Sequence, residues 1–179
     1  MNKAVLTWLY MLSILSVSSF SVEQSTIRSD YSIRNWGIED GLAQGSIACI
    51  AQTSDGYIWM GNQESLSRFD GVRIKNFTSR NTPSLKTSWT QSLAISTDQK
   101  LIIGTWRGGI YKMTEGGFQP LFEGEHPGLH QSIIYALACT EDGTVWAGTS
   151  NGLFSIKNGT VRAFNNPDRF NVHTVRSLL

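Results

Sequence analysis

The chain reads Thr53-Ser54-Asp55-Gly56-Tyr57-Ile58-Trp59-Met60-Gly61 near the end of its first third, and related phrases follow twice. The second is Ser96-Thr97-Asp98-Gln99-Lys100-Leu101-Ile102-Ile103-Gly104, and the third is Thr140-Glu141-Asp142-Gly143-Thr144-Val145-Trp146-Ala147-Gly148. The Asp positions are 43 and then 44 residues apart, and so are the closing Gly positions. Repeats of this length built from strands and tight turns are typical of β-propeller blades. The sequence therefore predicts an all-β fold.

Each repeat predicts one blade of four antiparallel strands. An alanine four residues before each Asp predicts an innermost strand, because blades converge there and leave little room; these are Ala51, Ala94 and Ala138. Asp55-Gly56 and Asp142-Gly143 predict type I′ hairpin turns, in which both residues tolerate a positive φ. Asp98-Gln99 predicts a different turn in the second repeat.

The strands after these turns predict how blades pack together. Trp59 and Trp146 are expected on the face between blades, where they serve packing rather than ligand binding. The later strand limits follow the same spacing. We expect third strands to start at Leu66, Ile110 and Leu153 and fourth strands to end near Phe77, Leu121 and Phe164.

The amino terminus predicts export. Met1-Asn2-Lys3 precedes an apolar run from Ala4 to Val17 and small polar residues up to Ser21, a pattern typical of a secretory signal peptide cleaved near Ser21. The alternative is an uncleaved amino-terminal anchor. Either reading puts the repeats outside the cytoplasm.

The domain limits follow from these patterns. We expect a signal peptide at 1–21, an amino-terminal segment with a ring-closing strand at 22–46, and propeller repeats at 47–179. The expected blades are at about 47–77, 90–121 and 133–164, with the start of a fourth at 172–179. A propeller closes with about four to eight blades, so the ring is predicted to be incomplete. We interpret the chain as the amino-terminal fragment of a longer protein. The alternative is a short protein that closes by oligomerising, and a homodimer is one partner that we consider.

The phrase Trp36-Gly37-Ile38-Glu39-Asp40-Gly41-Leu42, together with the stretch from Ile47 to Gly61, resembles the two-component regulator propeller repeat. The third repeat is most similar to that family, through the stretch from Asp142 to Phe154. The first repeat departs from the pattern at Asn62 and Ser65, and the second lacks the Trp and carries an extra residue at Arg107-Gly108-Gly109.

The resemblance implies an extracytoplasmic ligand-sensing region of a two-component or diguanylate cyclase signalling protein. In such proteins the propeller precedes a membrane span and a cytoplasmic histidine kinase or diguanylate cyclase, so the remainder of the sensor chain is an implied partner. The implied location is the periplasmic or extracellular side of a bacterial inner membrane. The alternative is a secreted β-propeller binding scaffold without signalling output.

Composition argues against several other functions. Residues 1–21 hold one Lys and no carboxylate, which leaves fourteen basic and fourteen acidic residues and argues against nucleic-acid binding. Cys49 and Cys139 belong to repeats that are not neighbours, so we expect no disulfide and two small buried thiols.

Catalytic and metal-binding patterns are missing from the sequence. His126 and His130 flank Pro127 and Gly128, which argue against a metal-binding helix. No nucleophile elbow, phosphate-binding loop or spaced carboxylate pair stands out. We therefore expect no catalysis, metal or cofactor in this chain.

Ligand binding is expected at one end of the blades, where the turns between second and third strands emerge together with the links between blades. The candidate residues there are Trp106, Arg107, Trp89 and Arg80, with His126 and His130 nearby. Aromatic rings beside an Arg suit a saccharide or a small anionic ligand. Trp106 is the most informative candidate because the other repeats place Gln63 or Ser150 near that position.

Overall fold

The computed structural model describes residues 32–124, 126–164 and 174–178. The chain divides into two units, Met1–Asn35 and Trp36–Leu179. The predicted signal peptide at 1–21 lies outside the described residues. Residues 32–35, the described part of the first unit, contain no strand, and neither does Trp36. The structure therefore forms no strand in the described part of the stretch from Tyr31 to Trp36.

Three four-stranded antiparallel sheets make up the second unit, together with η1 (Ile38–Asp40) and the single turn α2 (Pro127–His130). The first sheet contains β1 (Cys49–Gln52), β2 (Ile58–Gly61), β3 (Leu66–Phe69) and β4 (Ile74–Phe77). The second contains β5 (Thr90–Ile95), β6 (Leu101–Thr105), β7 (Ile110–Thr114) and β8 (Gly117–Pro120). The third contains β9 (Ile134–Cys139), β10 (Val145–Thr149), β11 (Gly152–Lys157) and β12 (Thr160–Ala163). These sheets confirm the predicted all-β fold of propeller blades.

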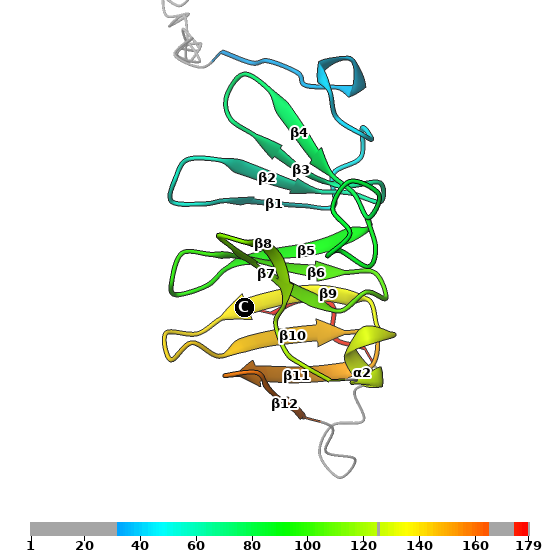
Figure 1. Ribbon diagram of the computed structural model, residues 1–179, viewed down its shortest axis with the longest axis vertical. Coiled ribbons are helices and arrows are strands. Elements are labelled where there is room, and N and C mark those ends of the chain that lie inside the picture. The colour runs from blue at the N-terminus through cyan, green and yellow to red at the C-terminus, as the bar shows by residue number, and fades with distance from the viewer. Residues whose placement is uncertain (1–31, 125, 165–173, 179) are drawn as a thin grey trace, which may run out of the picture. The chain divides into compact units, whose positions relative to one another are not determined.

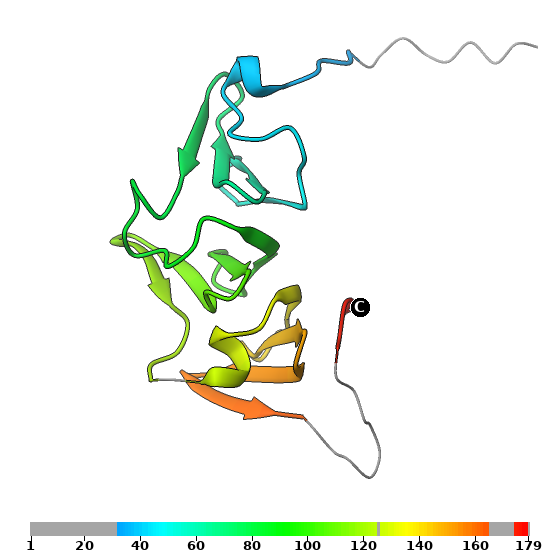
Figure 2. The same ribbon diagram turned by 90° about the vertical axis from the view of Figure 1, so that its right-hand side faces the viewer.

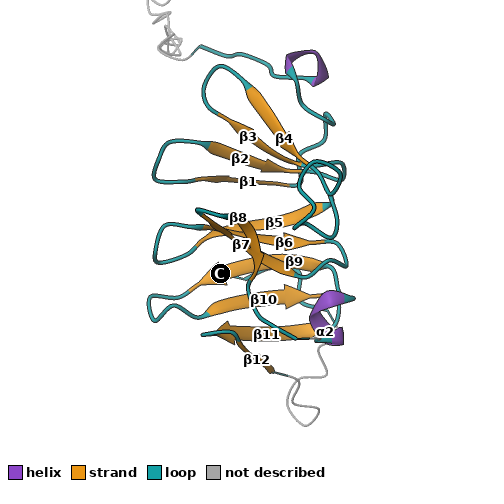
Figure 3. Cartoon of the chain, in the orientation of Figure 1, coloured by secondary structure: helices purple, strands orange, loops and turns teal. Residues whose placement is uncertain are grey.

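The three sheets follow one another in chain order (Figures 1 and 3), and the first strand of each sheet is its inner strand. Strand β5 contacts both β1 and β9, so the inner strands of neighbouring sheets lie side by side. The hairpins that carry the repeated Asp lie at one end of the strands. The turns between second and third strands lie at the other end, with the links between sheets (Figure 1).

The three Asp hairpins have the same turn, contrary to the prediction that the second one differs. Gly56, Gln99 and Gly143 have φ of 87°, 59° and 79°, and the backbone N–H of each donates to the backbone carbonyl of the Thr or Ser three positions earlier. Asp55 and Asp142 are not in the left-handed region, so these turns are not type I′. Gln99 therefore adopts the left-handed conformation that Gly takes in the other repeats, although non-Gly residues rarely adopt it.

The repeated alanines lie directly opposite the large residue of the second strand. Ala51 pairs with Trp59, Ala94 with Ile102 and Ala138 with Trp146. Paired residues of neighbouring strands share one face of a sheet. The small side chain therefore makes room for the large one within its own blade.

Two apolar cores fill the spaces between neighbouring sheets. The first core includes Trp59, Ile103 and Phe118, and the second includes Ile102, Ala147 and Phe154. Residues Ile102 and Ile103 are adjacent, so β6 supplies one core from each of its faces, as period-two alternation requires. Trp59 is 1% exposed, which agrees with the prediction that it packs between blades.

The closing Gly of each repeat touches the segment that follows its sheet, which for the first two repeats is the start of the next inner strand. A β-carbon on Gly61 would lie 2.6 Å from Cγ2 of Thr90, and one on Gly104 would lie 2.6 Å from Cγ2 of Ile134. A β-carbon on Gly148 would lie 2.8 Å from Cγ1 of Val175. The contact therefore recurs three times, and only Gly leaves space for it.

Residues 174–178 lie against the third sheet and form no strand. The N–H of Val175 donates to the carbonyl of Thr149 at 2.9 Å, as the N–H of Thr90 donates to Asn62 at 2.9 Å. Figure 2 shows the segment on the side of β9, away from β12. No helix in the described ranges is long and apolar enough to cross a membrane.

Candidate functional site

Trp89 and Trp106, two of the predicted ligand-binding residues, stack on each other. Their ring centroids are 3.9 Å apart and the ring planes differ by 10°. Trp89 precedes β5 and Trp106 follows β6, and the N–H of Trp106 donates to the carbonyl of Trp89 at 3.0 Å. Both side chains are half-buried, so the pair forms a fixed aromatic step at the end of the second sheet.

Arg107 follows this step with an exposed side chain and a left-handed backbone. Its φ is 55°, and its N–H donates to the carbonyl of Ser132 at 3.1 Å, in the link that leads to the third sheet. The Gly108-Gly109 pair comes next, and Gly109 has φ of 89°. The extra residue of the second repeat thus belongs to a turn in which Arg107, the residue after Trp106, is exposed to solvent.

Arg80 lies in a different place, a hollow of about 580 Å³ at the same end of the first sheet. Four segments meet there: η1 with the loop that follows it, the turn between β2 and β3, the chain after β4, and the residue before Trp89. The lining residues are mostly polar. They are Ile38, Ala43, Gln44, Glu64, Thr78, Ser79, Arg80 and Ser88.

Hydrogen bonds fix part of this lining. The N–H of Ser79 donates to Oγ of Ser88 at 3.0 Å, and the N–H of Gln63 donates to Oε1 of Gln44 at 3.3 Å. Arg80 is exposed. The hollow therefore offers one guanidinium, one carboxylate and several hydroxyl groups, which suits a polar ligand with an anionic group.

The four predicted ligand residues thus fall into two groups. Trp89, Trp106 and Arg107 are close together around the end of β6, whereas Arg80 belongs to the hollow of the first sheet. Sequence reasoning missed Gln44, Glu64 and Ser88 as members of this hollow. They carry no repeat signal, because each comes from a segment that differs among the blades.

The two histidines form a structural pair. The N–H of His126 donates to Nδ1 of His130 at 3.2 Å, and both rings pack edge-on against Phe122 at 5.3 and 5.2 Å. A single helical turn, α2, forms between them, because Pro suits the first position of a helix. No group of three or more His, Cys, Asp or Glu residues in the described ranges is arranged to hold a metal.

Both cysteines are free, and they are half-buried where the sequence predicted buried thiols. Burial raises the pKa of the Cys49 thiol to about 12, against a smaller opposing effect from the backbone of Gly61. Burial also raises the pKa of Cys139. Raised values argue against reactive thiols, because the thiolate is the nucleophile.

Comparison with known proteins identifies the repeats. Residues 41–64 and 128–151 match the sequence model of the family described as two component regulator propeller. The chain is also 30% identical over 78 residues to histidine kinase P4 of Formosa agariphila, an alignment that covers 44% of this chain and 6% of that protein. The matched segments contain the Asp hairpins of the first and third sheets, so the family predicted from the repeats is confirmed.

Solved structures share the blade architecture. An extracellular domain assigned to the hybrid two component system BT3049 of B. thetaiotaomicron superposes with a TM-score of 0.59 at 20% identity, covering 73% of this chain and 18% of that chain. The extracellular domain of BT4673 from the same organism gives 0.60 at 24% identity, with 76% and 18% covered. Virginiamycin B lyase from Staphylococcus aureus gives 0.55 at 18% identity, with 72% and 44% covered. The chain therefore spans less than half of each of these proteins.

Proposed function

We propose that this chain, which belongs to the two component regulator propeller family, is an extracytoplasmic ligand-sensing region of a two-component or diguanylate cyclase signalling protein. The observation that carries the proposal is the pair of family matches on the Asp hairpins of two separate blades. The alignment with a histidine kinase supports the signalling context. Fold alone does not carry it, because the same blades occur in a lyase.

Export of the repeats is part of this proposal. The pattern of residues 1–21 supports it, and so does the extracellular origin of two of the structural neighbours. A fusion of alkaline phosphatase after Leu179 tests the location in a bacterial host, because that enzyme is active only after export. We expect activity with the full amino terminus and loss of activity when residues 1–21 are deleted. Activity that persists in the cytoplasmic fraction contradicts the location.

The ligand is proposed to bind at the end of the blades that carries the links. The hollow around Arg80 supplies a cation and hydroxyl groups in one place, and the stacked Trp89 and Trp106 supply an aromatic step with Arg107 beside it. Both arrangements suit a saccharide with an acidic group or another small anion, since Arg pairs with carboxylates and phosphates through two parallel hydrogen bonds.

A binding screen with matched variants separates the two groups. The purified chain is titrated with a panel of neutral and acidic oligosaccharides and small anions by calorimetry, and the best ligand is tested on Arg80→Ala, Trp106→Ala and Arg73→Ala. Arg73 is exposed in the turn before β4 and outside the hollow, so it serves as the control. We expect loss of affinity by about tenfold or more from the variant whose group binds the ligand. Equal affinity in all three variants contradicts a site at this end.

Signalling output needs its own measurement. In cells that carry the complete gene, the ligand found by calorimetry is expected to change the activity of the attached kinase or cyclase, and the weakened variant is expected to shift that response to higher ligand concentration. Binding without any change in output assigns the chain to a secreted scaffold instead.

A further inference from the structure

The chain contains two Asn-Gly pairs, Asn151-Gly152 and Asn158-Gly159, and each lies at a turn of the third sheet. The backbone nitrogen that follows an asparagine can attack the carbon of its side-chain carboxamide. Gly favours this reaction, because it has no side chain to obstruct the attacking nitrogen and its backbone is conformationally permissive. In a folded chain, the reaction also requires an accessible carboxamide and a turn that is free to rotate.

Asn158 and Gly159 form the exposed turn between β11 and β12. Their φ angles are 50° and 75°, and the flanking Lys157 and Thr160 are paired in the register of the two strands. A two-residue connection in which both φ angles are positive is typical of a type I′ hairpin turn. Both turn residues are exposed, and in the described ranges neither the Asn158 carboxamide nor the Gly159 N–H makes a hydrogen bond. The two reacting groups are therefore accessible.

The hairpin that contains this turn lies at the edge of the third sheet. Strand β12 is at the end of the strand order and pairs only with β11. Three of its four residues are exposed, and only Val161 is half-buried. Segments with few buried contacts open at a low energetic cost. The Asn158 backbone can therefore rotate until the Gly159 nitrogen approaches the carboxamide carbon.

Asn151-Gly152 is held in place by buried contacts. Oγ1 of Thr149, a residue that is 0% exposed, accepts the N–H of Asn151 at 2.9 Å and donates to the carbonyl of Gly152 at 2.9 Å. Gly152 is buried and pairs with Thr149 in the register of β10 and β11. A β-carbon on Gly128 of α2 would lie 3.5 Å from Nδ2 of Asn151, so the carboxamide also lies close to a second element. Rotation at Asn151 would disturb all of these contacts.

We propose that Asn158 is a site of spontaneous deamidation, and that the contacts of Thr149 protect Asn151 from the same reaction. In the first step a base removes the amide proton of Gly159, and the nitrogen forms a bond to Cγ of Asn158. The carbon–nitrogen bond of the carboxamide then breaks, and the departing nitrogen takes up a proton and leaves as ammonia. Water opens the resulting succinimide ring at either carbonyl, which yields aspartate or isoaspartate at this position. The reaction consumes water, releases ammonia and needs no oxidant or enzyme.

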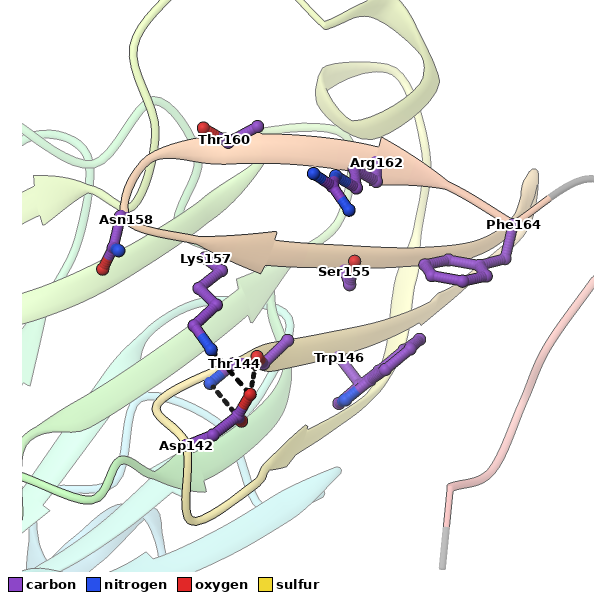
Figure 4. Close-up of a pocket in the computed structure, with 9 residues that line it drawn as sticks. All are labelled: Asp142, Thr144, Trp146, Ser155, Lys157, Asn158, Thr160, Arg162 and Phe164. Atoms are coloured by element: carbon purple, nitrogen blue, oxygen red, sulfur yellow. Dashed lines mark hydrogen bonds and ion pairs between the residues drawn. The ribbon is translucent and has the colours of Figure 1, made fainter.

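Either product places a new carboxylate beside the ion pair of Lys157 and Asp142. Figure 4 shows Asn158 at the turn next to Lys157, whose Nζ lies 2.7 Å from Oδ2 of Asp142. All three side chains border one hollow of about 450 Å³. Isoaspartate also inserts a methylene group into the main chain, and the longer turn no longer matches the two-residue connection between Lys157 and Thr160. Deamidation is thus expected to add negative charge to the hairpin and to loosen β12.

Peptide mass spectrometry of the aged chain tests the site. Trypsin cleaves after Lys157 and Arg162 and has no cleavage site between Lys112 and Lys157, so the two Asn-Gly pairs fall in different peptides. The folded chain is kept at mildly alkaline pH, and a freshly purified sample digested in parallel corrects for reaction during digestion. We expect conversion of Asn158 to be at least about tenfold faster than conversion of Asn151, with both aspartate and isoaspartate as products. Equal rates at the two positions, or an unreactive Asn158, overturn the proposal.

Two variants test each site separately. Asn158→Gln would need a larger ring for the same attack, so it is expected to stop conversion at that position and leave the rate at Asn151 unchanged. Thr149→Val removes the hydroxyl that holds the Asn151 turn and is expected to raise the rate at Asn151 by about tenfold. Hydrogen exchange checks that this variant keeps its three sheets. An unchanged rate at Asn151 in the folded variant overturns the protective role of Thr149.

Unfolding the original chain in urea measures protection by the fold without any substitution. The two Asn-Gly pairs are expected to react at similar rates there, because both turns are lost. A difference that persists in urea shows that the neighbouring sequence causes it, and overturns the role of the structure.

The effect on the hairpin is measured on the isoaspartate form, which ion exchange separates from the starting chain by its added charge. We expect faster hydrogen exchange in Thr160–Ala163 and unchanged exchange in the strands of the second sheet. Unchanged exchange in β12 overturns the loosening of the hairpin.

Discussion

The indole N–H of Trp59 donates a buried hydrogen bond to Oγ1 of Thr53 at 3.1 Å. The hydroxyl residue two positions before the repeated Asp is therefore not only part of the turn. Its hydroxyl donates to the Asp55 carboxylate within the hairpin and accepts the bond that fixes Trp59, the largest side chain of the first core. Trp59 and Thr53 are 1% and 4% exposed, so this bond is shielded from water.

Thr53→Val is expected to destabilise the first blade, because it keeps the shape of the side chain and leaves the indole N–H without an acceptor. A buried donor left unpaired costs about 1–3 kcal/mol. Chemical denaturation followed by Trp fluorescence measures the change. Thr140→Val is the matched control, since Thr140 makes the corresponding turn bonds to Asp142 and Thr144. Equal losses in the two variants would show that the indole bond contributes nothing.

Gly61→Ala is expected to destabilise the contact between the first and second sheets. The added methyl would lie 2.5 Å from Sγ of Cys49 and 2.6 Å from Cγ2 of Thr90, and Thr90 is a β-branched residue that is 2% exposed. Overpacking of this kind typically costs about 1–3 kcal/mol. Gly45→Ala is the control, because nothing lies within 4 Å of its added methyl. The midpoint of thermal unfolding is measured for both variants and is expected to fall only for Gly61→Ala. An unchanged midpoint for Gly61→Ala contradicts the close contact between Gly61 and Thr90.

The Asp142 carboxylate is expected to titrate below the ordinary range of an aspartate. Lys157 holds its pKa down most strongly, at 2.7 Å, and Thr140 and Thr144 add hydrogen bonds. Since the pKa in the folded chain is lowered, the charged form stabilises the fold above the unfolded value of about 3.9. That stabilisation is lost as pH falls through the lower folded value.

Carbon-13 NMR of the Asp142 carboxyl group measures this titration. In Lys157→Met its midpoint is expected to rise toward the ordinary value, whereas Lys112→Met removes the equivalent partner of Asp98 and is expected to leave Asp142 unchanged. A midpoint that stays the same in Lys157→Met excludes Lys157 as the main cause.

Cys49 is expected to resist alkylation in the folded chain. Its pKa of about 12 leaves little thiolate near pH 8.5, where the thiol of an unfolded chain is about half ionised. Labelling by iodoacetamide should therefore be at least about a hundredfold slower at Cys49 than in the chain unfolded by urea. Peptide mass spectrometry distinguishes Cys49 from Cys139. Comparable rates in the two conditions would contradict the buried environment.

The repeat was sufficient to predict the blades because strand periodicity and turn chemistry are local properties of the sequence. The predicted starts of the third strands at Leu66 and Ile110 agree with the structure, and so does the packing role of Trp59. The error at Gln99 arose because turn rules describe average preferences, and the hydrogen bonds of the hairpin hold this residue in a conformation that its side chain disfavours.

The candidate site was harder to predict because it combines non-repeating segments. The proximity of Trp89 and Trp106 follows from the start of one strand lying beside the end of the next, which the blade geometry implies. The hollow around Arg80 depends on the loop after η1, whose path across the first sheet is fixed by contacts such as Asn76 Nδ2 to the carbonyl of Gly41 at 2.7 Å. Such long-range contacts leave no periodic signal in the sequence.

The contact between each closing Gly and the following inner strand makes the blades a linear series with nearest-neighbour coupling. In such a series, stability is approximately the sum of terms for each unit and for each junction. A defect at one junction therefore lowers cooperativity locally, and distant units keep their own protection against hydrogen exchange. Along this chain, the outer blades should fray before the middle one, which is the only described unit coupled to a neighbouring sheet on both sides.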